Sequence, residues 1–201
     1  MIRGTTVIRP IALLLAATAF LGASASLAAV KPHNLFTPGA VLQRGREVPV
    51  WGTAADGEMV TVRFQGQELS TEAKDGRWRV TLQPLEAGGP FDLVISGQNT
   101  VEIKDVLVGE VWIASGQSNM QWAVSQSAEP EQTIAESANP MIRLFTVPRR
   151  ATAEPQTEVD AAWAQCGPET VPGFSAVAYA FGRDLQKHLN VPVGLIRTNY
   201  G

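Results

Sequence analysis

The chain has 201 residues, of which 45% are hydrophobic and 17% are charged, and its formal net charge is −3 at pH 7. Because the charges form no run of one sign, the composition gives no indication of a nucleic-acid partner or of binding to an anionic membrane surface. The single cysteine excludes an intramolecular disulfide, and the two histidines show no zinc-ligand spacing, so the sequence predicts neither a metal nor another cofactor.

The first residues, 1–29, resemble a secretory signal peptide. Arg3 and Arg9 give a basic start, an uncharged and mostly apolar run follows over 11–22, and small residues come next. This run is shorter than the about 20 apolar residues that span a membrane. We therefore expect a periplasmic or secreted protein without stable membrane insertion, with an uncleaved amino-terminal anchor as the alternative.

Residues 31–105 contain short alternating runs that are separated by turn residues. We expect strands over 47–51, 59–65, 68–73, 77–82, 91–96 and 100–104. Asp75-Gly76 is a strong hairpin signal because a type I′ turn needs positive φ at both central residues. Short strands at this spacing, without helical periodicity, predict a small β-sandwich or jelly-roll-like domain over residues 31–105.

The pattern changes after residue 105 to strands that alternate with helices. We expect strands over 106–114, 141–147 and 193–198, helices over 131–138 and 175–189, and a long polar connection over 149–172. Ser175 is in position to cap the second helix, and Asn190 and Pro192 to stop it. This order predicts an α/β layer over residues 106–201, with too few strands for a whole sheet, so we expect a piece of a longer protein.

Ser118 follows the strand predicted over 106–114, at a sharp turn where a helix can begin. Enzymes with α/β sheets place their chemistry at this edge, and the backbone N–H of a serine there can face an oxyanion, so acyl transfer is the favoured chemistry. The alternative is an ordinary N-cap serine. Met120 stands where the G-x-S-x-G motif has its second glycine, which argues against an α/β-hydrolase.

Several separated motifs occur along the chain in the order of a known family. They are Ala40-Val41-Leu42-Gln43-Arg44, Val48-Pro49-Val50-Trp51-Gly52, Asp75-Gly76-Arg77-Trp78, Val108-Gly109-Glu110-Val111-Trp112, Gly116-Gln117-Ser118-Asn119-Met120, Phe174-Ser175-Ala176, Phe181-Gly182-Arg183 and Val191-Pro192-Val193-Gly194-Leu195-Ile196. With them the chain resembles the sialate O-acetylesterase family of the SGNH hydrolases. The resemblance implies an incomplete flavodoxin-like, three-layer α/β domain behind the sandwich.

The same resemblance implies a serine esterase that removes O-acetyl groups from sialic acids or related acetylated sugars without a cofactor. Ser118 would be the nucleophile and its N–H one oxyanion donor, while Gly201 would give a second donor or be a simple turn glycine. Of the flanking residues, we expect Gln117 to hold the turn and Asn119 either to bind substrate or to orient the loop.

Serine needs a positioned base, and the family's Asp/His pair is expected beyond Gly201. His33 lies just after the signal segment. His188 is explained by an i,i+4 pair with Asp184 and by its place at a helix end. We therefore expect the 201-residue chain alone to be inactive as an esterase.

Other interpretations come from a different class or from other residues. The main alternative is a non-catalytic carbohydrate-binding or adhesive module carried by residues 31–105, and a peptidase that uses Ser118 has no feature in its favour. Cys166 has no base beside it, so we expect it to be buried or inert. Trp51, Trp78 and Trp112 are expected to pack in the core rather than stack on a sugar.

Overall fold

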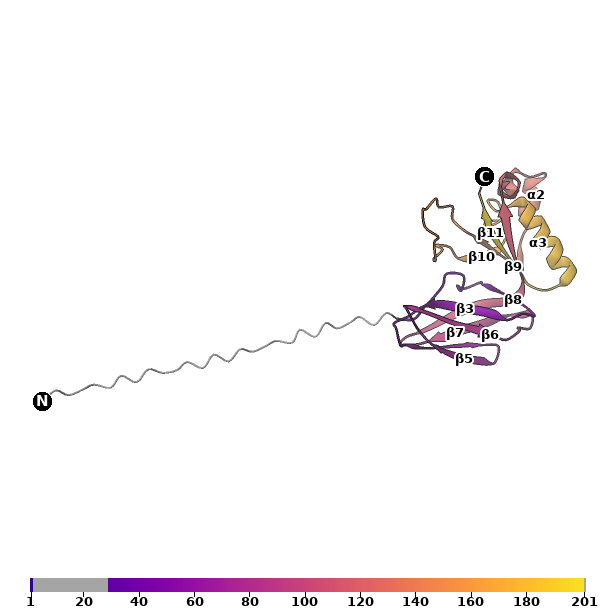
Figure 1. The fold of residues 1–201 in the computed structure, drawn as a ribbon. Coiled ribbons are helices and arrows are strands. Elements are labelled where there is room, and N and C mark those ends of the chain that lie inside the picture. Colours follow the sequence, from indigo (N-terminus) through magenta and orange to yellow (C-terminus); the bar gives the residue numbers. More distant parts are fainter. Residues whose placement is uncertain (2–28, 201) are drawn as a thin grey trace.

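The computed structural model describes Met1 and residues 29–200, which form a mixed α/β fold (Figure 1). The α/β fold class predicted from the sequence is confirmed. The predicted signal peptide lies outside the described residues apart from its first and last residue, and so does Gly201. In the part of the chain that the structure describes, no helix has the length and apolar character to cross a membrane.

Strands outnumber helices in the described chain. They are β1 (Lys31–Pro32), β2 (Val41–Gln43), β3 (Val48–Thr53), β4 (Met59–Phe64), β5 (Gln67–Glu72), β6 (Arg77–Leu82), β7 (Gly88–Ser96), β8 (Thr100–Gly116), β9 (Asn139–Thr146), β10 (Trp163–Cys166) and β11 (Val193–Asn199). The helices are α1 (Ser118–Gln121), the 3-10 turn η1 (Val124–Gln126), α2 (Pro130–Ala135) and α3 (Ala176–Leu189). The strand expected over 77–82 is confirmed at both ends, whereas β10 lies inside the segment expected to be a connection.

The amino-terminal strands form two sheets that face each other. One is the three-stranded sheet β1-β3-β6, and the other is formed by β5, β4, β7 and the first half of β8 (Figure 1). Strands β3, β4 and β6 bury alternate residues, as Trp78 and Val80 in β6 and Val60 and Val62 in β4 show. Burial of every second side chain matches the period of a strand with one solvated face, and the buried side chains fill the space between the sheets.

The turn at Asp75-Gly76 has the predicted geometry but a different role. Both residues have positive φ, 52° and 71°, and Lys74 and Arg77 exchange two backbone hydrogen bonds of 2.9 and 3.0 Å. However, β5 pairs with β4 while β6 pairs with β3, so the chain changes sheets at this turn. The predicted pairing across the turn is wrong because turn chemistry fixes the local backbone and not the partner strand.

The 17-residue strand β8 connects the two regions of the molecule. Its first half pairs with β7 in antiparallel fashion, and its second half runs parallel to β11 from Glu110 to Gly116. Within the first half, Asp105 adopts a φ of 61°, and its carboxylate receives two hydrogen bonds, of 2.5 and 3.0 Å, from Arg143 on β9. This ion pair connects β8 to β9 of the carboxy-terminal sheet a few residues before β8 changes its partner strand from β7 to β11.

The carboxy-terminal sheet is formed by β10, β9, β11 and the second half of β8, in that order. Strands β9, β11 and β8 are parallel, and β10 is antiparallel to β9. Helix α3 covers one face (Figure 1), where Ile142, Val193 and Leu195 are buried. The predicted cap of this helix is confirmed, since the Ser175 hydroxyl accepts a hydrogen bond of 3.2 Å from the N–H of Ala178. Packing of α3 on β11 places its amino-terminal end at the carboxyl edge of the sheet.

The tryptophans expected in the core divide into two groups. Trp78 is buried and Trp51 is half-buried against the sandwich core, but Trp112 is 45% exposed and forms an edge-on ring pair with Phe181, with ring centroids 5.0 Å apart. The expectation for Trp112 is therefore wrong. Among the described strands, the second half of β8 has β11 on one side alone, so Trp112 lies at an open edge.

Candidate active site

Ser118 lies directly beyond the carboxyl end of β8, where β11 also ends. Gly116 has a φ of 144°, which side-chain-bearing residues rarely adopt, and this lets the chain turn sharply before α1. The turn is tied to β11, because the N–H of Tyr200 donates a 3.0 Å hydrogen bond to the carbonyl of Gly116. The backbone thus holds the serine at the edge where parallel strands place functional groups.

The side chain of Ser118 is exposed, and its hydroxyl makes no hydrogen bond to any described residue. The N-cap of α1 is Gln117 rather than Ser118, and no side chain caps that helix. The simple interpretation of Ser118 as an N-cap is therefore wrong, and the hydroxyl is free to meet a substrate.

Ser118 lines a hollow of about 460 Å³ at this edge. The other lining residues are Gln121, Trp122, Ala123, Gln126, Arg149, Gly173 and Arg197. The segment after Ser118 is joined to the start of α3 by backbone bonds, among them Ala176 N–H to the carbonyl of Trp122 at 2.8 Å and Val124 N–H to that of Phe174 at 3.0 Å. These bonds give the hollow a fixed wall.

Arg197 brings positive charge into this hollow from β11. Its guanidinium donates a hydrogen bond of 2.5 Å to the carbonyl of Gly173 and lies 5.7 Å from the centre of the Phe174 ring. Burial lowers the pKa of Arg197, and the nearby charge of Arg149 lowers it further. Sequence reasoning missed both arginines, although one charged residue inside the apolar run over 193–198 was a usable signal.

Of the remaining predicted site residues, the structure describes Gln117 and Asn119 but not Gly201. Gln117 and Asn119 are exposed on either side of Ser118, and their side chains make no hydrogen bond to a described residue. The turn is held instead by the backbone, with the N–H of Gln121 donating to the carbonyl of Gln117 at 3.0 Å. The oxyanion role of Gly201 stays a prediction, since that residue is outside the described part of the chain.

Neither histidine is brought to Ser118. His33 is buried in the sandwich, where its Nδ1 accepts a hydrogen bond from the N–H of Leu35. His188 lies roughly 20 Å further along α3 than its N-cap Ser175, since a helix rises about 1.5 Å per residue. Its Nδ1 lies 2.9 Å from the backbone carbonyl of Asp184 rather than from the carboxylate, so the predicted side-chain pair is wrong.

Cys166 is buried as predicted, and its thiol donates to the carbonyl of Ser137 at 3.3 Å. Burial raises the pKa of this thiol to about 11, which keeps it protonated at neutral pH. Among the residues that the structure describes, no three His, Cys, Asp or Glu side chains gather where they could hold a metal ion.

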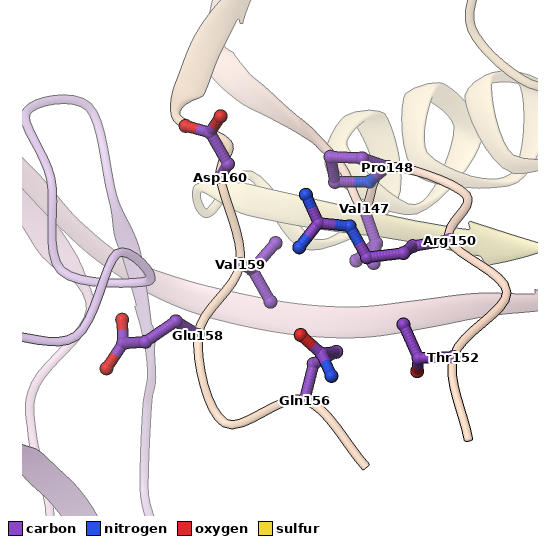
Figure 2. Close-up of a pocket in the computed structure, with 8 residues that line it drawn as sticks. All are labelled: Val147, Pro148, Arg150, Thr152, Gln156, Glu158, Val159 and Asp160. Carbon is purple, nitrogen blue, oxygen red and sulfur yellow. The ribbon is translucent and has the colours of Figure 1, made fainter. Parts of the chain in front are cut away.

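A second hollow, of about 340 Å³, lies under the connection between β9 and β10 and contains no serine. Figure 2 shows the guanidinium of Arg150 extending across it toward Val159, with Glu158 and Asp160 on the same wall as Val159. Arg149 and Arg150 are neighbours in sequence but line different hollows, and only that of Arg150 is also lined by carboxylates.

Comparison with known proteins finds relatives that are named as carbohydrate esterases. The chain is 35% identical over 173 residues to the sialate O-acetylesterase of Mus musculus and 34% identical over 175 residues to that of Homo sapiens, in each case over 76% of its length. The chain is a relative of the sialate O-acetylesterases. It spans about a third of these relatives, 32% and 33% of their lengths. No protein-family model matches it.

The fold comparison agrees with this relationship. A carbohydrate acetylesterase from Xanthomonas citri superposes with a TM-score of 0.83 at 34% identity, over 86% of this chain and 40% of that structure. The resemblance to the sialate O-acetylesterases that the sequence motifs predicted is thus confirmed in both sequence and fold.

Proposed function

We propose that the protein is a serine esterase that removes O-acetyl groups from sialic acid or a related sugar, with Ser118 as its nucleophile. The observation that carries this proposal is the exposed, unbonded hydroxyl of Ser118 at the carboxyl end of β8, beside a hollow large enough for one sugar. The similarity to the sialate O-acetylesterases and to the Xanthomonas citri carbohydrate acetylesterase supports it.

In the proposed reaction, the oxygen of Ser118 attacks the acetyl carbonyl, the C–O bond to the sugar breaks, and the sugar oxygen leaves with a proton. Water then hydrolyses the acetyl-serine and releases acetate. The N–H of Ser118 lies in the first turn of α1 and donates to no described residue, so it is available to the oxyanion. The N–H of Gly201 would be the second donor, and loss of one donor typically slows such a reaction about 10²–10³-fold.

Ser118 also needs a base, which the described histidines do not supply. We propose that the Asp and His which activate Ser118 come from polypeptide beyond Gly201, so that the 201 residues alone do not hydrolyse acetyl esters. The chain's span of about a third of its relatives leaves room for such residues.

We further propose that residues 1–29 direct the protein to the periplasm or outside the cell and are then removed. The basic start and the uncharged run over 11–22 support this. The amino-terminal sequence of the mature protein tests this proposal. A mature protein that still begins at Met1 would contradict removal of the segment.

A second candidate function has one observation in its favour. The sandwich carries a hollow of about 540 Å³ lined by Trp51, Trp78, Arg77 and Arg79, among other residues. Trp51 is half-buried, and an indole beside a guanidinium can pack against a sugar ring. This surface suits a carbohydrate-binding module, which would keep its affinity for sugar when Ser118 is replaced.

The deciding experiment is acetate release from O-acetylated N-acetylneuraminic acid. The protein translated from the complete reading frame should release acetate, and Ser118→Ala should abolish release. Ser125→Ala is the matched control, because Ser125 is exposed seven residues later but does not line the hollow. Turnover that survives Ser118→Ala would refute the proposal, and Ser118-dependent turnover by the 201 residues alone would refute the proposed origin of the base.

A further inference from the structure

Ser175 caps α3, and its hydroxyl also contacts the short helix that carries Ser118. The hydroxyl oxygen accepts a 3.2 Å hydrogen bond from the N–H of Ala178, and its proton is donated to the sulfur of Met120, which also lies 3.2 Å away. We propose that Ser175 is a positioning residue, which holds α1 through Met120 and so fixes the orientation of Ser118. This inference rests on the proposed esterase function and concerns how its nucleophile is held.

Helix α1 is too short to be stable by itself. Two backbone hydrogen bonds close its single turn. The N–H of Gln121 donates to the carbonyl of Gln117 at 3.0 Å, and the N–H of Trp122 donates to the carbonyl of Ser118 at 3.1 Å. No side chain caps the helix at Gln117, and isolated helices shorter than about 12–15 residues are marginal in water. The orientation of Ser118 therefore depends on contacts between α1 and the rest of the fold.

Met120 is the residue of α1 that faces the interior. Its side chain is half-buried and packs against the core under α3. Residues of a helix that are two positions apart point in directions roughly 200° apart, so Met120 faces inward where Ser118 faces outward. Within the described residues, Met120 is also the one member of α1 whose side chain makes a hydrogen bond. The bond to Ser175 therefore anchors the inner side of the helix and leaves the nucleophile exposed.

Ser175 is itself held in place on several sides. It is fully buried, and its backbone forms an antiparallel bridge with Ala123, beside the 2.8 Å bond from the N–H of Ala176 to the carbonyl of Trp122. Its hydroxyl has no acceptor other than Met120 among the described residues, and a buried hydroxyl without an acceptor is costly. The backbone bonds thus hold the chain that follows α1, and the bond to Met120 holds α1 itself.

The variants separate the bond to sulfur from the cap of α3. Met120→Leu keeps the side-chain volume and the apolar packing but removes the acceptor, and it leaves the cap in place. Ser175→Ala removes both the bond and the cap. Ser137→Ala is the matched control, because it deletes another buried hydroxyl, which donates to the carbonyl of Ile134 at 2.7 Å and is not bonded to α1.

The first measurement is hydrogen exchange at the N–H groups of Gln121 and Trp122, which close the turn of α1. It uses the protein translated from the complete reading frame. Met120→Leu and Ser175→Ala should each speed exchange at both groups roughly 5-fold, the usual effect of one lost hydrogen bond on a local opening. Ser137→Ala should leave both rates unchanged.

The second measurement is the kinetics of acetate release from O-acetylated N-acetylneuraminic acid. Met120→Leu and Ser175→Ala should each lower kcat roughly 10-fold and leave KM unchanged, since a reacting group misplaced by about 1 Å can lose 10²-fold in rate and a loosened one loses less. The double variant should be no slower than either single variant, because both substitutions remove the same bond. Ser137→Ala should lower the melting temperature and leave kcat unchanged.

The outcomes distinguish this inference from the esterase proposal. Exchange at α1 that is as slow in Met120→Leu as in the wild type would overturn the inference whatever the activity. Losses in kcat that add up in the double variant, or an equal loss in Ser137→Ala, would overturn it too. Release that depends on Ser118 but keeps its kcat in Met120→Leu and Ser175→Ala would refute this inference alone. No release by the wild type, with faster exchange in both variants, would refute the esterase and support the link between Ser175 and α1.

Discussion

The ion pair between Asp105 and Arg143 should make the largest single polar contribution to the stability of the junction between the sandwich and the carboxy-terminal sheet. The Arg143 side chain is 6% exposed, and its guanidinium donates to both carboxylate oxygens of Asp105 and to the carbonyl of Pro140. Asp105→Ala leaves this buried cation without its counter-charge, a change that costs about 3–5 kcal/mol when both partners are buried.

Two features of the structure adjust that figure. The Asp105 side chain is 47% exposed, so water can replace part of the lost interaction and reduces the cost to about 2 kcal/mol. Alanine must also adopt the φ of 61°, which adds about 1 kcal/mol. The total of about 3 kcal/mol corresponds to a fall in melting temperature of roughly 6–12 °C for a chain of this size. Asp105→Asn, which tolerates that φ and keeps an acceptor oxygen, should cost about 1 kcal/mol.

The assay is thermal or urea unfolding followed by circular dichroism. Glu68→Ala serves as the control, because Glu68 and Arg63 form a similar two-bond pair on an exposed surface, and its melting temperature should match that of the wild type. An Asp105→Ala protein as stable as Glu68→Ala, or an Asp105→Asn protein less stable than Asp105→Ala, would refute this reasoning.

Two further predictions concern a close backbone approach and a buried thiol. Gly109→Ala should destabilise the fold by about 2 kcal/mol, because its new methyl group would lie 1.9 Å from the carbonyl oxygen of Pro192, whereas Gly167→Ala meets nothing within 4 Å and should not; equal melting temperatures would contradict this. Burial raises the pKa of Cys166 from 9.0 to about 11, so the unfolded chain loses that proton first and stability should fall between pH 9 and 11 by on the order of 2 kcal/mol. Cys166→Ser should lose less over that interval, and parallel pH profiles of unfolding would show the thiol to be unperturbed.

Local patterns in the sequence predicted local structure well. The alternating residues of 77–82 and the apolar spacing with a serine cap over 175–189 specify a strand and a helix without help from distant residues. The turn at Asp75-Gly76 shows where this ends, because its backbone was predictable but its flanking strands pair in different sheets. The four-residue strand β10 was missed because a segment so short shows no period.

The site shows the same division. The position of Ser118 just beyond a strand was predictable, because the preceding residues are mostly apolar and Gly116 allows a sharp turn. The burial of Trp112 was predicted wrongly because it depends on which strands flank β8, and the period of the apolar residues does not reveal the neighbouring strands. Arg149 and Arg197 were missed because they lie 48 residues apart in sequence and meet only through the fold.

Reaction with a fluorophosphonate probe shows whether Ser118 is an activated nucleophile. The protein translated from the complete reading frame is labelled, digested and mapped by mass spectrometry. We expect one adduct per chain, on Ser118, and none in Ser118→Ala. An adduct on another serine, or an unlabelled Ser118 in a protein that releases acetate from O-acetylated sugars, would contradict this expectation.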